Sequence, residues 1–200
     1  ATLRGLIPGT KTTKTYDRIV PVWCDATKLD TQLEEEFWKA LQEHSFTRQP
    51  SFFYWGVGPT NRWLKLCTDD RYIHAAEVDL LLQNVNNIVD RVTDSGNRDV
   101  DVVSLGVGGG QKDAIIVDRL TKKSKSKSQL GFYPVDISMD MLLTGVETVL
   151  FPGGKGDALT ENVRVNAIRT DILDLYRFRR IFSQHWRNFF LLLGNTLGNF

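Results

Sequence analysis

Glycines occupy four of the five positions 106–110 of this 200-residue chain. They follow a mostly apolar stretch over residues 100–105 and precede a helical pattern that begins at Gln111. Glycines at the end of a strand let a ligand lie directly against the backbone, beside the amides exposed at the start of the next helix. The segment therefore predicts a binding site for a nucleoside-containing cofactor.

The spacing of these glycines disfavours two common kinds of nucleotide site. In the dinucleotide pattern G-x-G-x-x-G, the third glycine is replaced by Gln111 if the pattern starts at Gly106, and by Asp113 if it starts at Gly108. The Gly-Lys-Ser/Thr of a phosphate-binding loop is missing here and over residues 151–157. A tight turn without a ligand also fits the glycines, because such turns serve plain backbone geometry.

Acidic residues follow two further predicted strands. Asp136 ends a strand-like segment over 131–136, and Asp171 comes after another over 163–168. The carboxyl ends of parallel strands meet at one edge of a sheet, so these acids should lie near the glycines. A carboxylate at Asp136 can accept hydrogen bonds from both ribose hydroxyls of a nucleoside, and Asp171 can accept one from an adenine amino group.

Strands and helices alternate from about residue 98 onward, which predicts an α/β fold with a parallel sheet covered by helices. The expected strands are 101–105, 131–136, 163–168 and 189–193, and the expected helices are 112–122, 139–150 and 173–184. The first thirty residues show no period and predict an irregular lead. A helix should run from residue 30 or 31 to about 44, with Thr31 and Glu34 spaced as a capping box. After an aromatic stretch over 52–55, a longer helix should run from residue 69 or 70 to about 92.

Composition narrows the class of protein. The formal net charge is +1, so no general electrostatic attraction to nucleic acid is expected, and the lysine-serine run over 122–128 predicts a solvated loop. There is no apolar run for a membrane and no secretory segment, which favours the cytoplasm. The 3 histidines and 2 cysteines lack metal-ligand spacing, so we expect no metal site. The strand-like segment close to Phe200 leads us to expect further strands and helices beyond it.

Together with the glycines over 106–110, three segments resemble the histidine-specific methyltransferases. They are Pro-Val-Asp-Ile-Ser at 134–138, Thr-Asp-Ile at 170–172 and, most specifically, Leu-Leu-Gly-Asn-Thr-Leu-Gly-Asn-Phe at 192–200. Members of that family are S-adenosylmethionine-dependent and trimethylate the α-amino group of histidine, and relatives act on other amino acids. The resemblance covers residues 100–200. It implies a Rossmann-like class I methyltransferase sheet whose C-terminal part is absent here, preceded by a mainly helical N-terminal segment.

The resemblance also implies a cofactor-binding set along the strand ends, which comprises Gly106, Gly108, Gly110, Lys112, Asp136, Asp171, Ile172 and Gly194. The first three glycines would border the methionine part of S-adenosylmethionine, and the lysine matches one often present just after that turn. Asp136 would hold the ribose, Asp171 and Ile172 the adenine, and Gly194 would lie near the sulfonium. Tyr72 and Asn199 match residues that contact the amino-acid substrate.

These expectations define two parts of the chain and a methyltransferase function. Residues 1–97 form an N-terminal irregular and helical part that is a candidate for substrate binding, and residues 98–200 form the first half of the S-adenosylmethionine-binding domain. The methyl acceptor would be the amino group of histidine, of a related amino acid or of a small amine. The alternative is a non-catalytic S-adenosylmethionine- or nucleotide-binding domain of a larger assembly. A nucleotide-dependent oxidoreductase is disfavoured by the missing third glycine.

Overall fold

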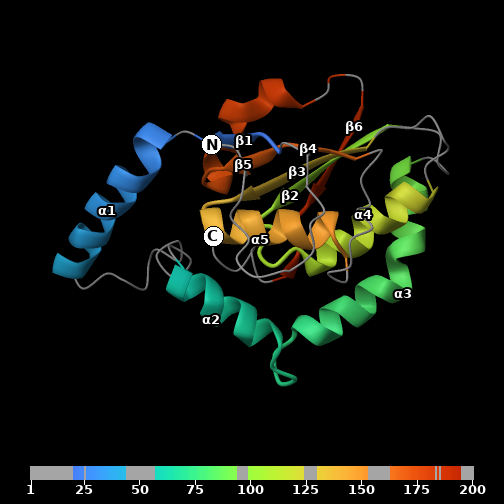
Figure 1. Ribbon diagram of the computed structural model, residues 1–200, viewed down its shortest axis with the longest axis horizontal. Helices are drawn as coiled ribbons and strands as arrows, with labels where there is room; N and C mark the ends of the chain where they lie inside the picture. Colours follow the sequence, from blue (N-terminus) through green and yellow to red (C-terminus); the bar gives the residue numbers. More distant parts are fainter. Residues whose placement is uncertain are drawn as a thin grey trace, which may run out of the picture.

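The computed structural model describes residues 20–24, 26–43, 57–93, 99–123, 130–152, 163–182, 184 and 186–194. Its elements, shown in Figure 1, are β1 (Val22–Cys24), α1 (Ala26–Gln42), α2 (Val57–Cys67), α3 (His74–Thr93), β2 (Val100–Leu105), α4 (Gln111–Lys123), β3 (Leu130–Asp136), α5 (Met139–Leu150), β4 (Val163–Val165), β5 (Ala167–Arg169), the 3-10 helix η3 (Ile172–Ile181) and β6 (Arg187–Leu191).

The strands form one 6-stranded sheet in the order β1-β5-β3-β2-β6, with β4 beside the start of β3. All the pairings are parallel, which confirms the sheet predicted from the alternating strands and helices. Every residue of β3 is buried, as are the first five of β2. Strands buried on both faces are typical of parallel sheets whose crossover helices cover them.

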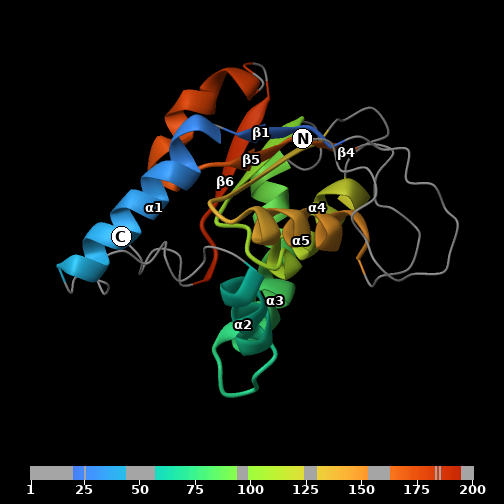
Figure 2. The same cartoon turned by 60° about the vertical axis from the view of Figure 1, so that its left-hand side comes forward.

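Helices cover the two faces of the sheet unequally (Figure 2). On one face Val102 and Phe132 pack in a large cluster with residues of α3, α4 and α5. On the other face Val103 and Tyr133 pack in a smaller cluster against η3. Neighbouring residues of one strand enter opposite clusters because side chains alternate across a strand with a period of two.

The prediction for the N-terminal part was wrong in two places. β1 pairs with β5, with Trp23 opposite Ile168, so residues 22–24 are a strand at the edge of the sheet and not an irregular lead. Three residues are too few to show an alternating pattern in the sequence. The first helix begins at Ala26, which places Thr31 inside the helix and rules out the predicted capping box.

Helix α2 was not predicted, and α3 begins later than expected. Gly58 and Pro59 are turn signals in the sequence, but the structure puts Pro59 third in α2, within the first turn, where a helix tolerates proline because that N–H has no intrahelical partner. Before α3, Asp69 accepts hydrogen bonds from the backbone N–H of Arg71 at 3.0 Å and from its guanidinium. This turn delays the helix to His74.

The C-terminal half follows the prediction with local differences. The single strand expected over 163–168 is divided into β4 and β5 at Asn166, whose N–H still donates to Phe132 O at 2.9 Å. The helix expected over 173–184 is the 3-10 helix η3. Its inward side chains, Leu175, Phe178 and Ile181, recur every three residues, which is the repeat of a 3-10 helix. Strand β6 lies two residues nearer the N-terminus than predicted.

Several predicted features lie outside the described residues: the aromatic stretch over 52–55, the turn after α3 and most of the lysine-serine run. Within the parts of the chain that are described, no helix combines the length and apolar character needed to cross a bilayer.

Candidate functional site: a cleft at the glycine turn

The turn between β2 and α4 has a backbone that only glycine adopts readily. The φ angles of Gly106, Gly108 and Gly110 are +74°, +54° and +72°. Gly106 N donates to Val135 O at 2.9 Å, which fixes the start of the turn to β3. At its end, a Cβ on Gly110 would lie 2.6 Å from Gly145 O, so α5 passes directly against the backbone of the turn.

The sheet order brings the predicted strand ends together. Strands β5, β3, β2 and β6 are neighbours. Asp136 is the last residue of β3, and Asp171, Gly106 and Gly194 come shortly after β5, β2 and β6 respectively. In the register, Asp136 lies opposite Arg169, and Thr170 N donates to Asp136 O at 3.1 Å. The expectation of one shared edge is confirmed.

Asp136 ties the glycine turn to the start of α5. Its Oδ2 accepts from Gly108 N at 3.2 Å, and its Oδ1 accepts from Ser138 N at 2.9 Å. Burial raises the pKa of Asp136 to about 6, against the opposing effect of the backbone N–H groups of Ser138, Gly108 and Ile137. Each carboxylate oxygen keeps a second lone pair that can accept from a ligand hydroxyl.

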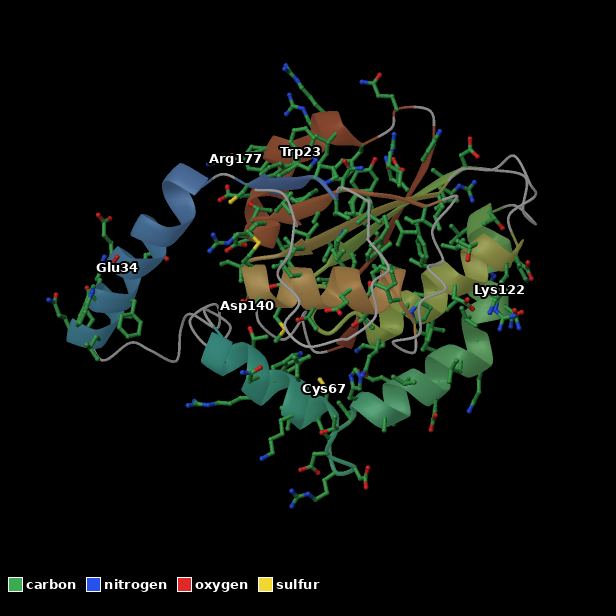
Figure 3. All side chains as sticks on the ribbon, viewed as in Figure 1. Trp23, Glu34, Cys67, Lys122, Asp140 and Arg177 are labelled. Atoms are coloured by element: carbon green, nitrogen blue, oxygen red, sulfur yellow. The ribbon has the colours of Figure 1, made fainter. Side chains whose placement is uncertain are left out.

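Helix α2 covers the glycine turn. A Cβ on Gly108 would lie 3.4 Å from Trp63 Nε1, and a Cβ on Gly109 would lie 3.1 Å from Leu64 Cδ2. At the other end of α2, the buried hydroxyl of Thr60 lies 3.3 Å from the hydroxyl of Ser138, which caps α5. Figure 3 shows Asp140, at the start of α5, on the side that α2 approaches.

A cation and a carboxylate meet beside Gly194. Lys112 Nζ donates to Glu77 Oε2 at 2.6 Å, and the two side chains are 14% and 26% exposed. Gly194 has a φ of +71°, and a Cβ on it would lie 2.6 Å from Lys112 Nζ. His74 and Gln111 share a second hydrogen bond between α3 and α4, at 2.7 Å.

These groups line one cleft between α2, α3 and the glycine turn. The lining residues are Trp63, Leu64, Cys67, Tyr72, His74, Glu77, Gly106, Val107, Gly108, Gly109, Gly110, Gln111, Lys112, Asp113, Leu193 and Gly194. Cys67, labelled in Figure 3, marks the end of α2 on this cleft. The ring of Tyr72 meets the ring of Trp63 edge to face, with centroids 5.9 Å apart.

Six of the ten predicted site residues thus line the cleft: Tyr72, Gly106, Gly108, Gly110, Lys112 and Gly194. Asp136 lies directly behind the turn and contacts it through Gly108 N. Asp171 and Ile172 are not among the residues lining the cleft, and Asp171 Oδ1 accepts from Leu173 N at 2.9 Å at the start of η3. Asn199 lies outside the described residues.

Residues 33–200 match the family of histidine-specific, S-adenosylmethionine-dependent methyltransferases. The chain belongs to this family. It is therefore an enzyme that uses S-adenosylmethionine as its methyl donor. No curated protein matches the chain.

The chemical groups at the cleft suit the cofactor of this methyltransferase. S-adenosylmethionine carries a zwitterionic amino-acid end, a ribose diol and a cationic sulfur. The cleft offers a bare glycine backbone for close approach, a lysine for a carboxylate, and acidic side chains for hydroxyl and ammonium donors. The residues present therefore fit the group.

Sequence reasoning missed several residues of the methyltransferase's cleft. Trp63 and Leu64 belong to α2. That helix was not predicted because Gly58 and Pro59, near its start, are turn signals in the sequence. In the sequence, Asp113 stands out only because it replaces the third glycine of the dinucleotide pattern, yet it is 3% exposed and accepts a hydrogen bond from Ser104. Burial raises the pKa of Asp113 to about 6, and its Oδ1 has no partner within the described part of the chain. An acid in the first turn of a helix ordinarily predicts an exposed cap, so this burial has no sequence signal.

Proposed function

We propose that the protein transfers the methyl group of S-adenosylmethionine to the amino group of histidine, of a related amino acid or of a small amine. One observation supports this proposal above the others. The cleft joins the glycine turn and Lys112 to Tyr72, which lies between α2 and α3 in the N-terminal part. A methyltransferase needs donor and acceptor sites that open into the same space.

For this reaction the protein must mainly align the methyl donor with the methyl acceptor. The cofactor supplies a methyl group on a positively charged sulfur, which a neutral amine can attack in line. Residues of this chain must hold the two molecules in that geometry, keep the amine deprotonated and exclude water. Trp63 and Leu64 lie over the glycine turn and supply an apolar cover for this purpose.

We assign the individual roles as follows. Gly106, Gly108 and Gly110 border the methionine part of the cofactor, and Gly194 lies near the sulfonium. Asp136 holds the ribose through the lone pairs that its backbone hydrogen bonds leave available. We propose that Asp171 and Ile172 contact the adenine. Both residues lie just after β5, at the cofactor edge of the sheet, which supports this role.

Tyr72 and Asn199 are proposed to contact the acceptor. We also propose that residues 1–97 supply the acceptor side of the cleft and residues 98–200 the cofactor side. Tyr72 and Trp63, both from the first part, line the same cleft as the glycine turn, which supports this division. The cytoplasm is the proposed compartment, and the free thiols of both cysteines suit its reducing conditions.

A methyl-transfer assay tests the proposal. The protein is incubated with methyl-labelled S-adenosylmethionine and each free amino acid, and label transfer to histidine or to another amine is expected. Tyr72→Phe should raise the KM for the acceptor by about two- to tenfold, the loss of one hydrogen bond. Tyr176→Phe is the matched control, because Tyr176 is 60% exposed on η3 and does not line the cleft.

One outcome would contradict the proposed acceptor. If S-adenosylhomocysteine binds but no amine receives label, the proposed class of methyl acceptor is wrong, and so is the proposed acceptor role of Tyr72.

A further inference from the structure

A pair of opposite charges lies on the wall of the cofactor cleft. Glu77 is in the first turn of α3 and Lys112 is the second residue of α4, and their side chains meet at 2.6 Å. Both line the cleft and both are largely withdrawn from solvent, with exposures of 26% and 14%. Charges in such a partly desolvated place interact more strongly with a ligand than charges in water do.

We propose that Glu77 and Lys112 together bind the amino-acid end of S-adenosylmethionine. The Glu77 carboxylate accepts a hydrogen bond from the α-ammonium group, and the Lys112 ammonium donates one to the α-carboxylate. The inference rests on the cofactor site proposed above and adds Glu77 to it.

Glu77 and Lys112 can bind a zwitterion while keeping the hydrogen bond between them. An ammonium group has three N–H donors, and Lys112 uses one of them on Glu77 Oε2. Glu77 keeps Oε1 as a further acceptor. A ligand with one ammonium and one carboxylate group can therefore bind so that each of the four charged groups lies beside groups of opposite charge.

The surroundings hold the pair in place. The absence of a side chain on Gly194 leaves room for Lys112 Nζ, since a Cβ there would lie only 2.6 Å away. The hydrogen bond between His74 and Gln111 links the same turns of α3 and α4. The position matches the proposed role of Gly194 near the sulfonium, from which the amino-acid end extends.

A structural role for the pair would be to tie α3 to α4, and the chain contains a matched control for it. Lys123 Nζ donates to Asp90 Oδ1 at 2.5 Å, which links the same two helices near their C-terminal ends. Neither residue lines the cleft. Figure 3 labels Lys122, which is next to Lys123 at this end of α4, and shows it well apart from Cys67 on the cleft.

The test compares two ligands in titration calorimetry of the whole chain. S-adenosylhomocysteine carries the amino-acid end, and 5′-methylthioadenosine has the same nucleoside without it. Glu77→Gln should weaken S-adenosylhomocysteine about tenfold or more, as expected for a hydrogen bond to a charged group, and leave methylthioadenosine within about twofold. Asp90→Asn should leave the affinities for both ligands unchanged.

Two results would overturn the inference while leaving the cofactor site standing. The first is an equal loss for both ligands in Glu77→Gln, which would mean that the pair only orders the helices. The second is unchanged binding of S-adenosylhomocysteine with weaker binding of histidine to the cofactor complex, which would assign Glu77 to the acceptor. If the unmodified chain binds neither nucleoside, the proposed cofactor site itself is wrong.

Discussion

Protonation of Asp136 should weaken cofactor binding as the pH falls below about 6. Burial raises the pKa of this carboxyl to about 6, and the ionised form is the one that accepts hydrogen bonds from two ribose hydroxyls. If only that form binds well, the apparent Kd rises by the factor 1 + 10^(pKa − pH). The affinity for S-adenosylhomocysteine should therefore be constant from about pH 7 to 8 and about tenfold lower at pH 5.

The assay is calorimetric titration with S-adenosylhomocysteine between pH 5 and 8 at constant ionic strength. Asp113 has a similarly raised pKa of about 6, and His74 also lines the cleft. The titration is therefore repeated in Asp113→Asn and His74→Gln, and both variants should keep the midpoint near pH 6. Asp136→Asn should bind more weakly at pH 8 and lose the pH dependence.

A pH dependence that persists in Asp136→Asn and disappears in Asp113→Asn would refute this reasoning. The titrating acid would then be Asp113, in the first turn of α4, and the ribose would be held by other residues.

Two predictions concern stability. Gly110→Ala should destabilise the fold, by about 1–2 kcal/mol for the positive φ and by about 1–3 kcal/mol for overpacking against Gly145 O, since the new Cβ would lie 2.6 Å from that atom. Urea unfolding measures this against Gly58→Ala, which meets no atom within 4 Å, and an equal effect of the two changes would contradict the packing argument. Asp113→Asn should stabilise the protein, because a pKa raised from 3.8 to about 6 means that the buried carboxylate destabilises the fold increasingly as the pH rises between those values. The gain should approach about 3 kcal/mol at pH 7 and vanish near pH 4; a gain of the same size at both pH values would show that burial of the charge is not its cause.

The sequence predicted the elements that build the centre of the sheet. Strands β2 and β3 and helices α4 and α5 begin and end within one residue of the predicted bounds. The strands are mostly apolar runs and the helices carry regular apolar stripes, so each pattern reports local burial. The order of the strands then places the glycine turn, Asp136 and Gly194 on one edge.

Features that depend on distant contacts could not be predicted. β1 is a strand only because β5 offers it a partner, and η3 follows the three-residue spacing of the side chains that meet the sheet. In the site, Glu77 meets Lys112 across 35 residues of sequence, and Thr60 meets Ser138 across 78. Local sequence patterns cannot predict these two contacts, because they form only when α2 and α3 pack against the rest of the fold.

Calorimetric titration of the chain with S-adenosylhomocysteine, run in parallel with NAD, tests the central claim most directly. The account predicts one binding site for S-adenosylhomocysteine and no binding of NAD, because the third glycine of the dinucleotide pattern is absent. Binding of NAD with no binding of S-adenosylhomocysteine would contradict the assignment of the glycine-turn cleft to the methyl donor.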